Sequence, residues 1–181
     1  PVLPINLPIS YNFHTFYINQ QARWIMLTLF QYNWQVREDW FQWCESIPEE
    51  EFHKERIGGM KSIRETLIHI VDCELLWLNS MLESKIVFEA RKEIDDLNAV
   101  KAYSTFVKAH TERFIKHLPS DYENVIVNVT RRDKTILHFT QKKILAHIIT
   151  HEVHHIGQLS IWAREMQLKP VSSDLIMRNY E

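Results

Sequence analysis

Apolar and aromatic residues recur at helical spacing along four long stretches of the chain, and few glycines or prolines interrupt them. Spacing of three and four residues between apolar positions is typical of helices that bury one face. Between the third and fourth stretches, "NVIVNVTRRDKTILHFT" alternates apolar and polar residues around a turn-like "RRDK", which predicts a β-hairpin. The predicted helices are Thr15–Cys44, Ile63–Leu82, Leu97–His117 and Thr140–Leu168, and the predicted strands are Asn124–Thr130 and Thr135–Phe139.

Local start and stop signals support these boundaries. Pro48 follows the first predicted helix and Pro119 follows the third, and a polar segment with a glycine pair separates the first helix from the second. Ser62, followed three residues later by Glu65, forms a potential capping box at the start of the second helix. The pattern therefore predicts an all-α fold, a four-helix bundle with a short β-hairpin before the last helix, in one domain that spans residues 1–181.

Composition and charge narrow the classes of partner. The formal net charge is -2, the sequence pI is about 6.6, and no segment concentrates Lys and Arg, so we expect no nucleic-acid partner. No apolar run approaches the ~20 residues that span a bilayer, so we expect no membrane partner. Two cysteines are too few for a disulfide framework, and the first residues lack the pattern of a secretion signal. We expect a cytoplasmic protein with a small-molecule ligand.

Histidines concentrate in the last predicted helix and just before it. The chain has ten, and five of them lie between His138 and His155. When the helix is projected at about 100° per residue, His155 falls inside the apolar, core-facing arc and His151 falls at its edge. His154 projects away from this arc, as expected of a surface residue. The pair that faces the core is therefore the one spaced by four residues.

This inward-facing pair predicts a divalent metal site. Catalytic sites of this type usually have three protein ligands and an open position, and His69 is our third candidate because it interrupts the apolar run of the second helix. Glu152 also falls on the core arc, where it either orients a ligand, acts as a general base, or pairs with a Lys or Arg of a neighbouring helix. Gln158 either forms a hydrogen bond in the same pocket or is an ordinary polar residue.

The same residues form a pattern associated with zinc proteases. The sequence "HEVHH" fits H-E-x-x-H. In the extended form of that motif a Gly stands three residues after the second ligand and a His three residues further on, whereas here Gly157 comes two residues after His155 and position 161 is Ile. A Glu ligand from a later helix is also hard to supply, because Glu165 belongs to the same predicted helix. The protease hypothesis is therefore disfavoured.

Other potential ligands fit a structural role better. Cys73 lies one turn after His69, but a buried cysteine usually acts as a small hydrophobic residue. We expect the remaining histidines of the helices and hairpin to be surface or packing residues, and the tryptophans to line the core and the pocket. These histidines are His110, His117, His138 and His147.

Two segments carry a resemblance to a known family. "GGMKSIRETLIHIVDCELLWLNSM" and "LAHIITHEVHHIGQLSIWAREMQLKP" resemble the DinB family of metalloproteins, and "LFQYNW" in the first predicted helix resembles the first helix of that family. The resemblance covers residues 22–180. It is carried by His69 together with His151, His155 and the Gly157-Gln158 pair.

The resemblance implies a four-helix bundle, often a homodimer, that holds a divalent metal through three histidines. The matching positions are His69, His151 and His155. Nickel and zinc are the metals associated with the family. Some of its members are thiol-dependent transferases or isomerases that use bacillithiol, mycothiol or glutathione, and others are described as metal-dependent hydrolases or as damage-inducible proteins.

Three hypotheses for function follow. The first is a metal-dependent enzyme that acts on a small molecule, by S-transfer from a low-molecular-weight thiol or by hydrolysis. The second is a non-catalytic stress-response protein in which the metal is structural, which requires a fourth protein ligand such as Glu152 or His154. The third is that no metal binds.

Overall fold

The computed structural model describes the backbone of residues 9–179 and the side chains from Arg23 onward. In this part of the chain the structure is mostly helical, with a small antiparallel sheet before the last long helix, as predicted. The elements in chain order are α1 (Ile9–Glu45), α2 (Glu49–His53), α3 (Ile63–Ser80), the 3-10 helix η1 (Glu89–Glu93), α4 (Leu97–Lys116), β1 (Ile126–Thr130), β2 (Ile136–Thr140), α5 (Gln141–Glu165) and the 3-10 helix η2 (Leu175–Met177).

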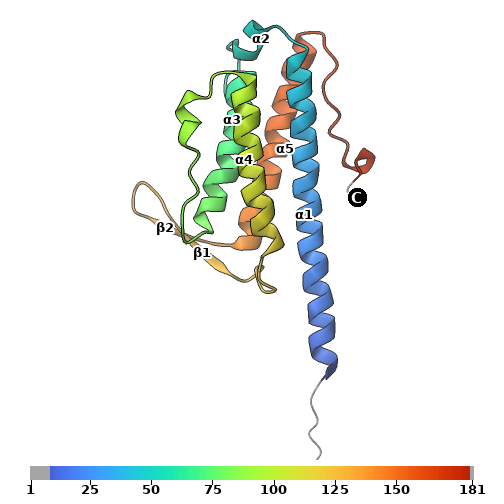
Figure 1. Cartoon of the computed structure of the whole chain (residues 1–181), viewed down its shortest axis with the longest axis vertical. Helices are drawn as coiled ribbons and strands as arrows, with labels where there is room; N and C mark the ends of the chain where they lie inside the picture. Colours follow the sequence, from blue (N-terminus) through green and yellow to red (C-terminus); the bar gives the residue numbers. More distant parts are fainter. Residues whose placement is uncertain (1–8, 180–181) are drawn as a thin grey trace, which may run out of the picture.

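The four long helices lie side by side (Figure 1). Helices α1 and α3 each pack against both α4 and α5, so the two helices with the inward-facing histidines, α3 and α5, are direct neighbours. Helix α2 lies at one end of the helices, the β1–β2 hairpin lies near the other, and the N-terminal part of α1 projects beyond its neighbours. Within residues 9–179, no helix is long and apolar enough to cross a membrane.

Polar side chains begin three of the long helices. The hydroxyl of Ser62 accepts a hydrogen bond from the backbone N–H of Glu65 at 3.1 Å, which confirms the predicted start of α3. Asp96 and Thr140 form the equivalent bonds at the starts of α4 and α5. Because α5 begins directly after β2, the hairpin fixes where this histidine-bearing helix starts.

Two boundaries differ from the prediction. Helix α1 begins at Ile9 rather than Thr15, directly after the last proline of the lead-in, because residues 9–14 contain no helix breaker. The segment after Pro48 was predicted as a plain connection but forms the short helix α2, whose first turn has three acidic residues that favour a helix N-terminus. The other helix and strand ends lie within about one helical turn of their predicted positions.

Two apolar clusters form the core, and buried charged side chains lie between them. Along α1, Trp34 belongs to one cluster and Trp40 to the other, with Arg37 between them. Glu74 and Glu152 occupy the same intermediate position along α3 and α5. All three charged side chains are buried, at 1%, 0% and 2% exposure respectively. His69 on α3 and His151 and His155 on α5 lie near these buried glutamates in the sequence of each helix.

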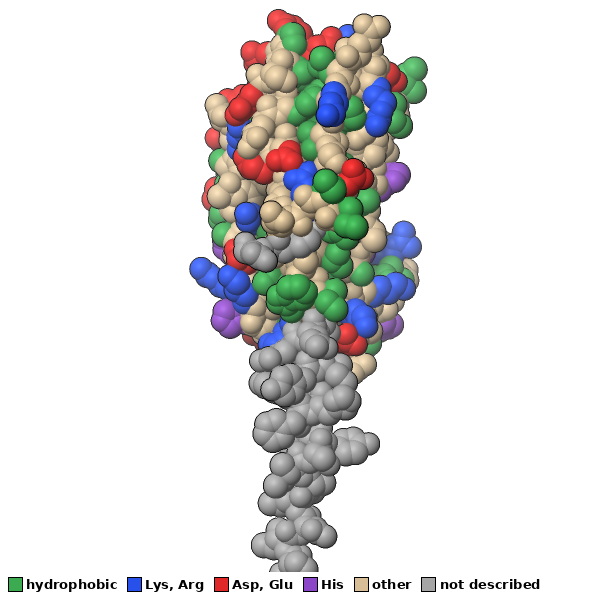
Figure 2. All heavy atoms as spheres, turned by 90° about the vertical axis from the view of Figure 1, so that its right-hand side faces the viewer, with side chains coloured by type: hydrophobic (Ala, Val, Ile, Leu, Met, Phe, Trp, Pro, Cys, Tyr) green, Lys and Arg blue, Asp and Glu red, His purple; other side chains and the backbone are tan. Residues whose placement is uncertain are grey.

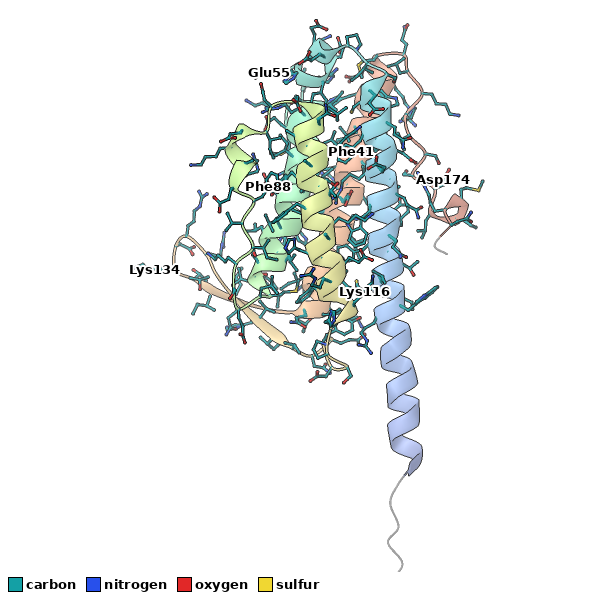
Figure 3. All side chains as sticks on the ribbon, in the orientation of Figure 1. Phe41, Glu55, Phe88, Lys116, Lys134 and Asp174 are labelled. Atoms are coloured by element: carbon teal, nitrogen blue, oxygen red, sulfur yellow. The ribbon has the colours of Figure 1, made fainter. Side chains whose placement is uncertain are left out.

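The α1 side of the protein carries charges of both signs. Figure 2 shows Lys and Arg side chains interspersed with Asp and Glu on this face, together with hydrophobic side chains over α1 and the C-terminal segment. Deeper in the molecule, Phe41 of α1, labelled in Figure 3, belongs to one of the two apolar clusters.

Candidate metal centre

Three histidine side chains from two neighbouring helices converge in the structure. The Nε2 atom of His69 on α3 lies 3.2 Å from Nε2 of His151 on α5, and Nε2 of His155 lies 3.3 Å from the same atom. The ligand atoms of all three residues lie within 4.8 Å of one another. The structure therefore brings together the three histidines that the sequence analysis selected as metal ligands.

Burial favours the neutral form of two of these imidazoles, His151 and His155. Burial, followed by the proximity of His155 and His69, lowers the pKa of His151 from its usual 6.5 to about 4. Burial also lowers the pKa of His155, which is only 6% exposed. A neutral imidazole offers a nitrogen lone pair to a metal, whereas a protonated one does not. Three converging imidazole nitrogens fit a divalent cation.

Gln158 fixes which nitrogen of His155 is free to bind. The Nδ1–H of His155 donates a hydrogen bond to Oε1 of Gln158 at 2.8 Å, and because an amide oxygen only accepts, Nε2 must carry the lone pair. The amide Nε2 of Gln158 donates in turn to Nε2 of the exposed His154 at 3.0 Å. Gln158 therefore forms a hydrogen bond at the site, and His154 lies on the surface as expected.

A glycine in the loop before α3 leaves room for the amide of Gln158. Gly59 has a φ of +52°, and a Cβ there would lie 2.8 Å from Oε1 of Gln158 and 3.1 Å from the ring of Trp162. A side chain at this position would strain the backbone and displace the amide. Gly157 differs, because a Cβ added there meets nothing within 4 Å. Of the Gly157-Gln158 pair, it is Gln158 that has a contact with the site.

Glu152 lies in a separate environment from the histidines. Nε and Nη2 of Arg37 on α1 donate to the two carboxylate oxygens of Glu152 at 2.8 and 2.6 Å. Nη2 also donates to Glu74 at 2.7 Å, and Nη1 donates to Ser104 at 3.2 Å. Of the three roles considered for Glu152, the structure shows pairing with an Arg of a neighbouring helix. Both oxygens are engaged there, so a role as general base has no geometric support.

A cavity of about 600 Å³ opens beside the cluster. His69 and His151 form part of its wall, and most of the other lining side chains are apolar. This size and character are typical of small-molecule sites. A second cavity of about 600 Å³ lies between α1 and α4, but no histidine or cysteine lines it. The chemistry-bearing residues therefore point to the first cavity, which we call the histidine-site cavity.

Several polar residues on this wall were not identified from the sequence. Asp72 accepts two hydrogen bonds from Arg91 at 2.6 and 2.5 Å and one from the hydroxyl of Tyr103 at 2.9 Å. His147, which we expected to be a surface or packing residue, lines the cavity with its ring centroid 5.7 Å from that of His151. The sequence offered one signal for this role, because His147 precedes His151 by one helical turn. In the helical projection, however, His147 falls outside the core-facing arc.

Cys73 also lines the histidine-site cavity, and it is buried. Burial, followed by the negative charge of Glu74, raises the pKa of its thiol to about 12. The group is therefore a neutral thiol at neutral pH, which makes it a poor nucleophile and a poor metal ligand. This agrees with its expected role as a small hydrophobic residue.

The fold and site define a class of helical protein with a three-histidine cluster, compatible with a divalent metal, between two adjacent helices. The model of the DinB family matches residues 18–180, and the chain belongs to that family. The protein named "Uncharacterized protein YizA" from Bacillus subtilis strain 168 is 39% identical over 153 residues, which is 84% of this chain and 95% of that protein. "Protein DinB" of the same organism is 21% identical over 143 residues, 76% of this chain and 83% of that protein.

Proposed function

We propose that this protein is a metal-dependent enzyme that acts on a small molecule, with a divalent metal held by Nε2 of His69, His151 and His155. The observation that carries the proposal is the convergence of these three nitrogens beside a cavity of about 600 Å³, with His69 and His151 on the cavity wall. Three protein ligands beside a cavity are typical of a catalytic metal site, whereas a structural site is usually closed by a fourth. Neither candidate for a fourth ligand supports a closed site, because Glu152 pairs with Arg37 and His154 is exposed.

We further propose that the reaction is S-transfer from a low-molecular-weight thiol. Metal-dependent hydrolysis commonly uses a carboxylate base to activate water. In the described part of the chain, the two buried or cavity-lining carboxylates nearest in sequence to the histidines are Glu152 and Asp72, and both are held in Arg pairs. A thiol has less need of such a base, because a bound metal lowers its pKa and yields a thiolate at neutral pH.

The cavity wall also supplies a residue that can accept the proton of the thiol. His147 is exposed and lies beside His151, so its imidazole is positioned to take the proton that the thiol releases. Trp77 stacks edge-on against His147, with ring centroids 5.3 Å apart, and orients that ring. In the transfer, the thiolate sulfur forms a bond to an electrophilic carbon, and the leaving group departs with the electron pair and takes up the proton.

Metal analysis tests the first part of the proposal. Purified wild-type protein should bind about one equivalent of nickel or zinc, and His155→Ala should lose most of it. His154→Ala is the matched control, because His154 neighbours the cluster but does not belong to it, and it should retain the metal. Equal metal content in wild type and His155→Ala would overturn the assignment of ligands.

Thiol-transfer assays test the second part. The metal-loaded protein should conjugate at least one of bacillithiol, mycothiol or glutathione, through its sulfur, to a model electrophile. His147→Gln should lower kcat and leave the metal content nearly unchanged. If added thiol leaves the ligand-field spectrum of the cobalt-substituted protein unchanged, the thiol does not enter the coordination shell and S-transfer is refuted.

A further inference from the structure

We propose that the histidine-site cavity selects small organic anions, with an apolar body held by its aliphatic and aromatic wall and the anionic group held by Lys85. This inference rests on the proposed function, because it names the substrate class of the same site. Three features carry it: the fixed position of the segment that bears Lys85, the pairing of every other charged group on the wall, and the apolar character of the remaining wall.

Hydrogen bonds to α3 hold the segment that bears Lys85 in place. Residues 81–88 connect α3 to η1, and residues 85–88 line the cavity. The side-chain amide of Asn79 donates to the carbonyl of Ile86 at 2.9 Å and accepts from its N–H at 2.7 Å. Lys85 is the residue directly before this double hydrogen bond, so its backbone is fixed at the edge of the cavity.

Aromatic contacts hold the same segment from its other end. The ring of Phe88, labelled in Figure 3, lies 4.9 Å from the ring of Tyr103 and 5.1 Å from that of Phe106, both on α4. Three residues further on, Arg91 forms its bidentate pair with Asp72 of α3. The segment is therefore attached to both helices that flank it, α3 and α4, and this part of the cavity wall has a defined conformation.

Lys85 is the charged group on the wall that lacks a counter-ion. The other charged side chains there, Asp72 and Arg91, neutralise one another at 2.5 Å. Lys85 has no ion pair with any described residue. With Asp72 and Arg91 paired, the ammonium of Lys85 is the unbalanced charge among these lysine, arginine and carboxylate groups of the wall, which favours an anionic ligand.

The rest of the wall suits an apolar ligand body. Leu75, Trp77, Ile86, Val87 and Phe88 line the same cavity as Lys85 and the histidines. Apolar walls supply affinity by burial, and a small number of polar groups then fix the orientation of the ligand. A carboxylate at Lys85 would leave the opposite end of such a molecule in the cavity that His69 and His151 line.

Direct binding of a matched probe pair tests the inference without any catalytic readout. The probes are 4-phenylbutyrate and the uncharged 4-phenylbutanamide, measured by calorimetry on metal-free protein at low ionic strength. We expect the carboxylate to bind about five- to tenfold more tightly than the amide, with the difference reduced at high salt. Equal affinity for the two probes would overturn the inference.

Two lysine variants in the connection between α3 and α4 locate the anion contact. Lys85→Gln should remove the preference for 4-phenylbutyrate and leave the affinity for 4-phenylbutanamide unchanged. Lys92→Gln is the matched control, because Lys92 is an exposed residue of η1 that does not line the cavity, and it changes the net charge equally. If both variants lose the preference to the same extent, general surface charge explains it and Lys85 has no specific role.

The metal-free measurement also separates this inference from the proposed function. If the probes bind as expected while wild type and His155→Ala contain equal metal, the cavity assignment stands and the metal assignment fails. If the metal binds but the carboxylate preference persists in Lys85→Gln, the metal assignment stands and the role of Lys85 is refuted.

Discussion

The buried ion pairs of Arg37 make the sharpest prediction about stability. Replacing Arg37 with Met keeps most of the side-chain length and removes the guanidinium that holds Glu74 and Glu152. Both carboxylates are buried, at 0% and 2% exposure, so water cannot replace the lost donors without rearrangement. The variant therefore leaves two acidic groups in the middle of the core with no counter-charge.

Two estimates of the cost of one stranded carboxylate agree. Removing one partner of a buried ion pair typically lowers the free energy of unfolding by about 3–5 kcal/mol. Alternatively, a stranded carboxylate takes up a proton, which at pH 7 costs about 3.7 kcal/mol per group from a reference pKa of about 4.3 and about 1.4 kcal/mol per pH unit. At pH 5 the same step costs only about 1 kcal/mol. The deficit of Arg37→Met should therefore shrink markedly between pH 7 and pH 5.

The sign of this pH dependence follows from linkage. In the variant the pKa of the stranded carboxyls is higher in the folded state than in the unfolded state. At pH values between these two pKa values the folded protein therefore binds more protons than the unfolded protein. Relative to wild type, its stability is highest below the unfolded pKa near about 4.3 and falls as pH rises through the folded pKa. Acidification should therefore relieve the defect.

Urea denaturation of metal-free protein, followed by circular dichroism, measures the effect. With a slope of about 2 kcal/mol per molar urea, one stranded carboxylate lowers the midpoint by about 1.5–2.5 M, so Arg37→Met should lower it by at least that much at pH 7. Arg132→Met, at an exposed arginine of the hairpin turn, is the control and should change it little. A deficit of Arg37→Met below about 1 kcal/mol, or one equal at pH 7 and pH 5, would refute the reasoning.

Three further predictions concern the site and its supports. Gln158→Leu removes the acceptor for Nδ1–H of His155 and should weaken metal binding about 10- to 100-fold in a competition titration, with little loss of helicity; unchanged affinity would show that the tautomer is fixed otherwise. Ser62→Ala removes the cap of α3 and should cost about 1 kcal/mol in urea denaturation, and a neutral result would mean that the cap is replaced by water. Because the pKa of His151 is lowered to about 4, only the unfolded state is protonated between about pH 4 and pH 6.5, so the unfolding free energy of metal-free protein should fall as pH falls through that window. His151→Gln should flatten this slope, and an unchanged slope would contradict the assigned pKa.

Periodicity and capping signals were sufficient for the long helices because those signals are local. Ser62 begins α3 as predicted, since its hydroxyl needs only the backbone three residues ahead. The inward direction of His155 also follows from its own helix, where the apolar residues at helical spacing define the buried face. The short helix α2 was missed because five residues give too little periodicity for a prediction.

The charged partners could not be predicted because they depend on the register between helices. Arg37 lies 115 residues from Glu152 in the sequence, and only the packing of α1 on α5 brings them together. Arg91 reaches Asp72 from a connection whose path has no periodic signal. The histidine-site cavity has the same origin, because its wall combines α3, α5, α4 and the segment 81–88.

The structure shows that the histidines and the glutamate of "HEVHH" serve different parts of the protein. His151 and His155 face α3 and meet His69, whereas Glu152, one residue away, faces α1 and pairs with Arg37. Residues at adjacent positions of a helix point about 100° apart, so one turn of α5 can serve a polar site on one side and a buried ion pair on the other. The protease-like pattern thus combines two separate structural requirements. It follows that Glu152→Gln should affect stability through Arg37 far more than metal binding, the reverse of what a catalytic base in an H-E-x-x-H motif would show.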